Sequence, residues 1–139
     1  MKIYTSYFAV ANKLPPDMIK ISIAGKAPDG WNGLKYRALA PRWTFFESWQ
    51  QTKDNDYYIE CYNEQVLSKL DPQSVLDKLK TAYLFMRNRN NNEEISYTAD
   101  SDLCLMCYEK PDSFCHRHLV ADWLNAAGIE CEEYIIRKD

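Results

Sequence analysis

A chain of 139 residues, 46% hydrophobic and 14% aromatic, can bury a core of its own, which predicts a single domain over residues 1–139 and excludes a disordered chain. Its formal net charge of −3 argues against non-specific binding of duplex nucleic acid through a basic face. No segment approaches the about 18 apolar residues of a membrane helix, and the start of the chain does not have the pattern of a signal peptide. The five cysteines therefore indicate reduced thiols and a cytoplasmic location.

The first part of the chain predicts two strands and then a helix. Residues 2–5 are expected to form a short strand, and residues 18–24 (MIKISIA) have the alternation and β-branched content of a second one. Glycines and a proline within residues 25–30 predict a loop. After Pro41, the spacing of apolar residues predicts a short helix over residues 42–51, whose Trp43 and Trp49 are expected in the core. Trp31, on the glycine-flanked loop before it, is a candidate for stacking on a base or sugar.

The middle of the chain has two further helical signals. Asn63 is expected to cap a turn or two of helix that ends at Leu70. Asp71 then provides an N-cap, with Pro72 at the first helical position. The apolar residues that follow at helical spacing are Val75, Leu76, Leu79, Tyr83 and Met86. The polar, asparagine-rich residues 87–102 predict an exposed loop.

A buried strand and an amphipathic helix are predicted near the end of the chain. Residues 103–108 (LCLMCY) form a continuous apolar run, which is typical of a strand covered on both faces in a parallel sheet. Asp112 or Ser113 is expected to cap a helix over residues 114–127, and Gly128 is expected to end it.

The order of these elements defines the expected fold class. Residues 131–136 supply a last strand, so strands and helices alternate along the chain. We therefore predict an α/β fold, a three-layer sandwich with a mainly parallel central sheet flanked by helices, in which the strand 103–108 is central.

The first turn of the predicted helix holds Cys115, His116 and Arg117, which is an unusual place for cationic side chains. The N-terminal end of a helix carries about half a positive charge and has N–H groups without partners. A cation there costs a few tenths of a kcal/mol unless an anion lies in front of it. The pattern indicates a negatively charged ligand or an acidic partner residue, and the planar donor fork of Arg117 suits phosphate or carboxylate.

The strand before this helix brings further candidate residues to the same place. Side chains alternate along a strand, so Cys107 and Glu109 share a face at its carboxyl end. Ligands bind at the carboxyl ends of strands in open α/β sheets, so we expect one small pocket shared by these two residues and the start of the helix. Glu109 and His116 are then candidate acid–base groups, with Cys107 as a ligand contact. Cys115 is a candidate nucleophile, because a helix N-terminus lowers the pKa of a thiol.

Two other predicted strands also end in polar residues, which could contact a ligand in the same pocket. Thr5 and Ser6 follow the first strand, and Lys26 follows the second. If these strands neighbour residues 103–108, two hydroxyl groups and an ammonium group become further candidate ligand contacts.

Structural interpretations stay open beside these roles. Cys115 is also explained as a small buried residue, and Arg117 as the partner of Glu109 that fixes the loop between strand and helix. Cys107, Cys115 and His116 have the residue types of a zinc site. Their spacing matches no common finger or ribbon, so the sequence favours no metal and no cofactor.

The run LCLMCYEKPDSFCHRHLVADWL at residues 103–124 resembles the DUF488 family, whose members have a hydrophobic strand ending in Cys-Xaa-Glu, a short loop, and Cys-His-Arg at the opening of a helix. The segments KIYTSYF and ISIAGKAP resemble the family's first two strands and their loops. The signature positions are matched by Cys107, Glu109, Cys115, His116 and Arg117. The resemblance implies an α/β fold and a shared polar site, without a particular reaction.

These observations lead us to expect binding of an anionic ligand at the strand-to-helix pocket: a nucleotide, a phosphorylated small molecule or a nucleic-acid end. Two alternatives stay open, a non-catalytic protein that binds or sequesters a nucleotide-derived signal, and a structural Glu109–Arg117 pair in a protein-interaction domain. The net charge makes nucleic acid the less favoured partner, and no membrane partner is expected. A homodimer is possible, because ten tyrosines and four tryptophans are more than a core of this size has to bury.

Overall fold

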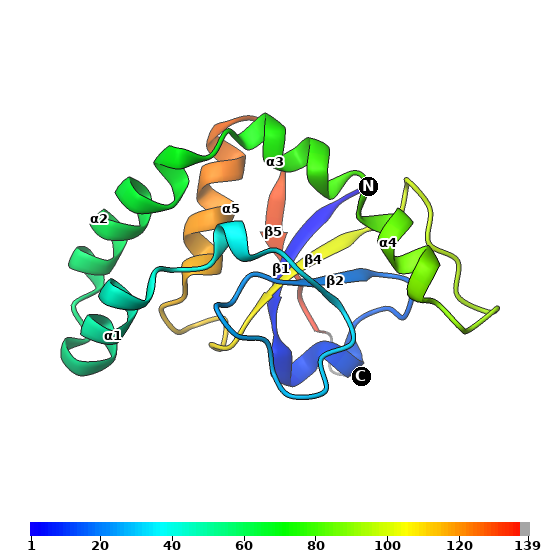
Figure 1. The fold of residues 1–139 in the computed structure, drawn as a ribbon, viewed down its shortest axis with the longest axis horizontal. Coiled ribbons are helices and arrows are strands. Elements are labelled where there is room, and N and C mark those ends of the chain that lie inside the picture. The colour runs from blue at the N-terminus through cyan, green and yellow to red at the C-terminus, as the bar shows by residue number, and fades with distance from the viewer. Residues whose placement is uncertain (137–139) are drawn as a thin grey trace.

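The computed structural model describes residues 1–136, and within them the strands form one five-stranded sheet in which every pairing is parallel (Figure 1). The strands are β1 (Ile3–Tyr7), β2 (Ile19–Ser22), β3 (Leu34–Lys35), β4 (Leu103–Cys107) and β5 (Cys131–Glu133). Their order across the sheet is β3-β2-β4-β1-β5. The α/β fold with a mainly parallel sheet and a central strand at residues 103–108 is therefore confirmed.

The helices lie between the strands in the chain, and all five α-helices pack on the same face of the sheet. The α-helices are α1 (Trp43–Thr52), α2 (Asn55–Gln65), α3 (Pro72–Leu79), α4 (Ala82–Arg89) and α5 (His116–Ala126). In Figure 1 they gather on one side of the sheet, while the 3₁₀-helix Phe8–Lys13 and loop segments lie on the other side. None of the helices within residues 1–136 is long and apolar enough to cross a bilayer.

The register of the sheet sends alternate side chains of each strand into two separate cores. Ile3 pairs with Leu103 across β1 and β4, and both pack with Leu105 in the larger core under the α-helices. The smaller core on the opposite face consists of Leu14, Met18, Cys104 and Met106. All five residues of β4 are buried, because the strand is paired on both edges and covered on both faces.

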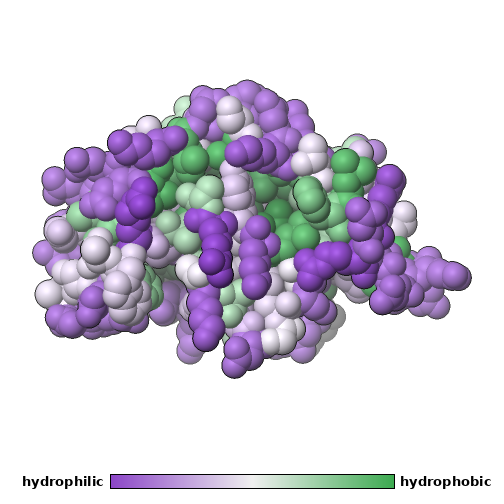
Figure 2. All heavy atoms as spheres, in the orientation of Figure 1, coloured by the Kyte–Doolittle hydropathy of each residue, from purple (hydrophilic) through white to green (hydrophobic). Residues whose placement is uncertain are grey.

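Most of the surface in this view is hydrophilic, as Figure 2 shows, and hydrophobic atoms come to the surface in the gaps between the helices. On α4, Leu84 is 45% exposed and Phe85 is 60% exposed. Single exposed apolar side chains of this kind are normal in folded proteins.

Several of the predicted helical boundaries differ from the structure. Asn63 lies inside α2 rather than at its start, because Asp54 is the N-cap and its carboxylate accepts a hydrogen bond from the N–H of Tyr57 at 3.1 Å. Asp71 caps α3 as predicted, but the apolar stripe that follows it is divided between α3 and α4. At the break, the hydroxyl of Thr81 donates to the carbonyl of Lys78 at 2.8 Å and competes with the helical hydrogen bonds.

Helix α5 begins later than predicted. Its N-cap is Cys115, which has extended backbone angles (φ −157°, ψ 143°), so neither Asp112 nor Ser113 caps it. The N–H of Ser113 instead donates to the carbonyl of Lys110 at 3.0 Å, in a turn that precedes the helix. Gly128 ends the helix region as predicted, with a left-handed φ of 80°.

Candidate functional site

A cavity of about 440 Å³ opens where β4 ends and α5 begins. Its floor consists of three buried residues, Cys107, Cys115 and His116. Exposed Lys26 and Glu109 lie at its rim. Its walls are aromatic: Trp43, Phe46, Trp49, Tyr58, Tyr108 and Phe114. The cavity therefore occupies the position where open α/β sheets bind their ligands, beyond the carboxyl end of a central strand.

The aromatic wall depends on the turn between α1 and α2. Lys53 ends α1 with a left-handed backbone (φ 55°), and Asp54 starts α2 as its N-cap. The ammonium group of Lys53 lies 3.9 Å from the ring centroid of Trp49, in a cation–π contact. Phe114, from the segment before α5, lies 5.6 Å from Trp49 and 5.0 Å from Tyr58 between ring centroids. Three separate segments thus build one continuous aromatic surface.

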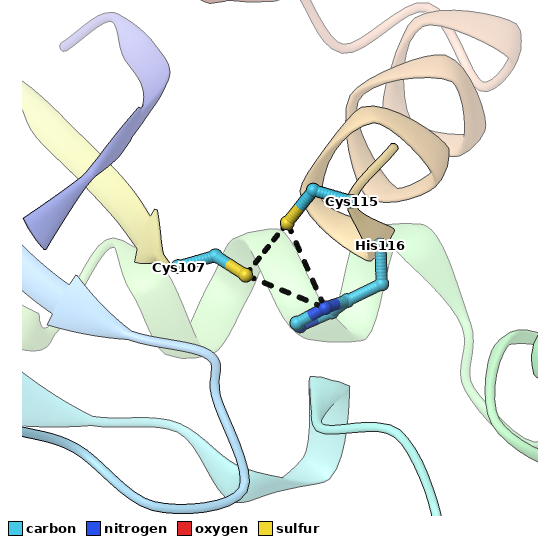
Figure 3. Close-up of side chains that lie close together, drawn as sticks. All are labelled: Cys107, Cys115 and His116. Carbon is cyan, nitrogen blue, oxygen red and sulfur yellow. Dashed lines mark hydrogen bonds between the residues drawn. The ribbon is translucent and has the colours of Figure 1, made fainter. Parts of the chain in front are cut away.

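The floor of the cavity brings two thiols and an imidazole together, as Figure 3 shows. The Sγ atoms of Cys107 and Cys115 are 2.6 Å apart, and Nδ1 of His116 lies 3.5 Å from the first and 4.0 Å from the second. Nε2 of His116 lies 2.8 Å from the carbonyl oxygen of Ile23. Because a carbonyl only accepts, we assign the ring proton to Nε2, which leaves the lone pair of Nδ1 facing both sulfurs.

The two thiols have opposite electrostatic environments. The pKa of Cys107 is lowered, first by its hydrogen bond with Cys115 and then, against the effect of burial, by the N–H groups of Tyr108 and Glu109 and the charge of Arg117. The pKa of Cys115 is raised, first by the same thiol contact and then by burial. The helix N-terminus led us to expect the lowered pKa at Cys115. In the structure the lowered pKa falls on Cys107 instead, while the contact between the two thiols and burial raise the pKa of Cys115.

Arg117 is completely buried and does not line the cavity. Its Nε and Nη2 donate to the two carboxylate oxygens of Glu133 at 3.0 and 2.9 Å, and its Nη1 donates to the backbone carbonyl of Glu109 at 2.5 Å. The acidic partner is thus Glu133 and not the carboxylate of Glu109, which corrects the structural interpretation of the sequence. With its donors used in this way, Arg117 is not free to bind a ligand in the cavity directly.

The other predicted contacts divide between the cavity and the sheet. Lys26 lines the cavity, and its carbonyl accepts a hydrogen bond from the hydroxyl of Tyr108 at 2.6 Å, which joins the two rim loops. Thr5 lies outside the cavity, where its hydroxyl donates to Glu133 at 2.6 Å. Ser6 is also outside, and its buried hydroxyl has no partner among the described residues. The strands β1 and β2 both neighbour β4, but only the segment that follows β2 lines the cavity.

Sequence reasoning missed the aromatic wall. It interpreted Trp43 and Trp49 as core residues and considered Trp31 as the aromatic residue that could stack on a ligand. Trp31 instead packs edge-to-face on Phe8 at 5.0 Å between ring centroids, and its Nε1 donates to the carbonyl of Leu34 at 2.9 Å. Trp43 is 64% exposed at the cavity. Its place at the first position of α1, after Pro41, was the available signal, because residues at a helix start often lie outside the apolar stripe.

The fold and the site define an α/β domain with an aromatic cavity above a Cys–Cys–His floor, at the carboxyl edge of a parallel sheet. The chain belongs to the DUF488 family: the family model described as "DUF488-N3a: Active DUF488-N3 subclade" matches residues 8–128. The match spans β4, the floor of the cavity and α5, and it confirms the resemblance noted in the sequence. No curated protein and no solved structure matches the chain significantly.

Proposed function

We propose that the cavity binds a small organic ligand that combines a flat ring system with an anionic group, such as a nucleotide or another phosphorylated small molecule. The observation that carries the proposal is the aromatic wall around a cavity of about 440 Å³, which lies within the usual size range of ligand pockets. Flat aromatic or heteroaromatic rings stack favourably on such walls.

Two features near the rim support an anionic group on the ligand. Lys26 supplies an exposed ammonium group, and α5 directs its N-terminus at the cavity floor. The first N–H groups of a helix favour negative charge. Arg117 contributes little net charge, because Glu133 neutralises it at close range. The anion is therefore proposed to lie near Lys26 and the start of α5, and a nucleic-acid end would present the same chemistry.

Catalysis on the bound ligand is a second step of the proposal. Exposed Glu109 and buried His116 both line the cavity, which suits an acid and a base acting on one ligand. A protein that only sequesters the ligand needs the walls and Lys26, and does not need Glu109. A cytoplasmic location is proposed on the ground that all five cysteines are free and buried.

Ligand binding is tested by thermal unfolding with nucleoside mono- and diphosphates, the corresponding nucleosides and inorganic phosphate as probes. We expect at least one nucleotide to raise the Tm of the parent protein more than its nucleoside does. Trp43→Ala is expected to weaken that binding about tenfold through lost stacking, and Lys26→Ala to weaken it about tenfold for the phosphorylated probe only.

The matched control is Phe85→Ala, because Phe85 is 60% exposed, much like Trp43, but does not line the cavity. Equal loss of affinity in Phe85→Ala and Trp43→Ala would contradict the proposal, and so would a parent protein that none of the probes stabilises. Glu109→Gln separates the two forms of the proposal: a sequestering protein keeps its affinity and forms no product before or after the change, whereas an enzyme loses turnover.

A further inference from the structure

We propose that Cys107, Cys115 and His116 hold one thiophilic divalent metal ion of the Zn²⁺ class, with a coordination position left open toward the cavity. The three ligand atoms lie within 4.8 Å of one another. Two thiolates and an imidazole are ligands that zinc prefers. This inference does not depend on the proposed ligand, because the three protein ligands hold the ion without one. A bound ion would occupy Nδ1 of His116, so acid–base catalysis in the loaded protein would rest on Glu109 and not on His116.

The histidine is oriented as a metal ligand requires. Nε2 of His116 lies 2.8 Å from the carbonyl oxygen of Ile23, so the lone pair of Nδ1 faces the two sulfurs. Metal-binding histidines almost always donate their second ring N–H to a carbonyl, a carboxylate or water, which fixes both the tautomer and the ring. The ring is also buried, and its centroid lies 5.6 Å from that of Tyr62.

Three distances join the ligand atoms at the floor, and two of them, those from nitrogen to sulfur, are close to the values of a tetrahedral metal site. Bond lengths of about 2.3 Å to sulfur and about 2.1 Å to nitrogen place a sulfur and a nitrogen about 3.6 Å apart. The observed distances from His116 Nδ1 to Cys107 and Cys115 are 3.5 and 4.0 Å. The two sulfurs are 2.6 Å apart, whereas a tetrahedral ion needs about 3.8 Å. Metal binding thus requires the two cysteine side chains to move apart by about 1.2 Å.

The charges around the floor suit a buried divalent ion. Two thiolates balance its charge, so that the loaded site is neutral. The nearest buried charge, Arg117, is already paired with Glu133 at 2.9 Å and does not compete with the ion.

The three-ligand arrangement explains why the spacing rule for zinc fingers gave no signal. Closed structural sites use four protein ligands, often in two short pairs, whereas catalytic sites use three and keep a position for water or substrate. Here the three ligands come from the end of β4 and the start of α5, and all three line the cavity. An ion at this floor would present its open position to whatever the cavity binds, beneath exposed Glu109.

The first experiment uses zinc and cobalt alone as probes on the reduced parent protein. We expect one equivalent of Zn²⁺ to remain bound in the presence of a competing colorimetric chelator. We also expect Co²⁺ to give the sulfur-to-metal charge-transfer band and the intense visible bands of a tetrahedral thiolate site. A parent protein that retains no Zn²⁺ and gives only the weak spectrum of hydrated cobalt would overturn the proposal.

Variants assign the ligands. Cys107→Ser, Cys115→Ser and His116→Gln are each expected to weaken Zn²⁺ binding at least tenfold, and each serine variant to lower the charge-transfer intensity of cobalt by about half. The matched control is Cys104→Ser, since Cys104 is a buried cysteine of the same strand whose side chain lies in the opposite core. Equal loss of metal in Cys104→Ser would count against the assignment.

Oxidation provides an independent readout that does not depend on whether a variant folds. Two sulfurs this close could instead be joined as a disulfide, which leaves no thiolate for a metal. The parent protein, purified without reductant, is expected to have the mass of the fully reduced chain under denaturing conditions. Under native conditions it is expected to have that mass plus one metal ion, minus the two protons that the thiolates release. A mass lower by two hydrogens, with Cys107 and Cys115 linked in the peptide map, and no recovery of metal binding after reduction, would refute the metal site.

Discussion

Arg117 of α5 and Glu133 of β5 form a bidentate ion pair, and each of the two side chains also makes a hydrogen bond to a further segment of the chain. The guanidinium reaches both carboxylate oxygens, at 3.0 and 2.9 Å, and also the backbone carbonyl of Glu109. The hydroxyl of Thr5 on β1 donates to the same carboxylate at 2.6 Å. The pair thus joins two parallel strands, the helix and the loop that leads into the cavity. It holds the start of α5, and with it Cys115 and His116, in place.

Arg117→Met is expected to destabilise the protein by about 3–5 kcal/mol, because it leaves the carboxylate of Glu133 without its cation in a partly buried position. Urea unfolding followed by circular dichroism measures this change. Exposed Arg42 supplies the control, since Arg42→Met should change the free energy of unfolding by less than about 0.5 kcal/mol.

A double variant distinguishes the ion pair from general packing of Arg117. Combining Arg117→Met with Glu133→Leu removes both charges together, so the double variant is expected to be more stable than the sum of the two single changes predicts. Additive losses would show that the pairing itself contributes nothing.

The presence of an acidic partner for Arg117 could be predicted from the sequence, whereas its identity could not. A cation at the positive end of a helix dipole is unfavourable unless an anion lies nearby, so the sequence alone predicts an acidic partner. Glu109 was the nearest acid on the expected strand face. Glu133 is 16 residues away in the chain, and becomes a neighbour only because β5 pairs with β1 on the far side from β2. The order of strands in the sheet is a tertiary property that hydrophobic patterns do not encode.

The strands likewise include some that the sequence predicts and one that it does not. The apolar run of β4 and the alternation of β2 predict those strands, because burial of one or both faces leaves a pattern over several residues. β3 has only two residues, Leu34 and Lys35, which is too short for any period, and it was missed. The floor of the cavity was predicted because its residues are close in sequence. The aromatic wall was missed because it depends on how α1 and α2 pack against the segment before α5.

The N-cap of α3 provides a local test of the sequence-based interpretation. The carboxylate of Asp71 accepts hydrogen bonds from the N–H and the hydroxyl of Ser74, at 2.9 and 3.1 Å. Asp71→Ala is expected to destabilise the protein by about 1 kcal/mol, since the cap and its favourable interaction with the helix dipole are both lost. Asp77→Ala near the other end of the same helix is the control, expected to change stability by less than about 0.5 kcal/mol. Equal effects at both positions would argue against the cap.

Stability at alkaline pH is expected to depend on Tyr62. Its ring is completely buried in the larger core, and its hydroxyl donates to the carbonyl of Leu39 at 2.5 Å. Burial raises the pKa of Tyr62 well above the ordinary value of 10.0, and the neighbouring Tyr58 adds to the shift. The folded protein therefore keeps this phenol neutral under conditions in which the unfolded chain ionises it.

The sign of the pH dependence follows from that difference. Below a pH of about 10 both states hold the proton, and the stability is fully present. As the pH rises above this value the unfolded chain releases the proton and is favoured, so the free energy of unfolding falls as the pH approaches the raised pKa of the folded state. Tyr62→Phe should cost about 1 kcal/mol near neutral pH through the lost hydrogen bond, and should make the alkaline decline shallower. Urea unfolding at a series of pH values measures both effects. An unchanged alkaline slope in Tyr62→Phe would show that ionisation of Tyr62 is not what limits the stability of the protein at high pH.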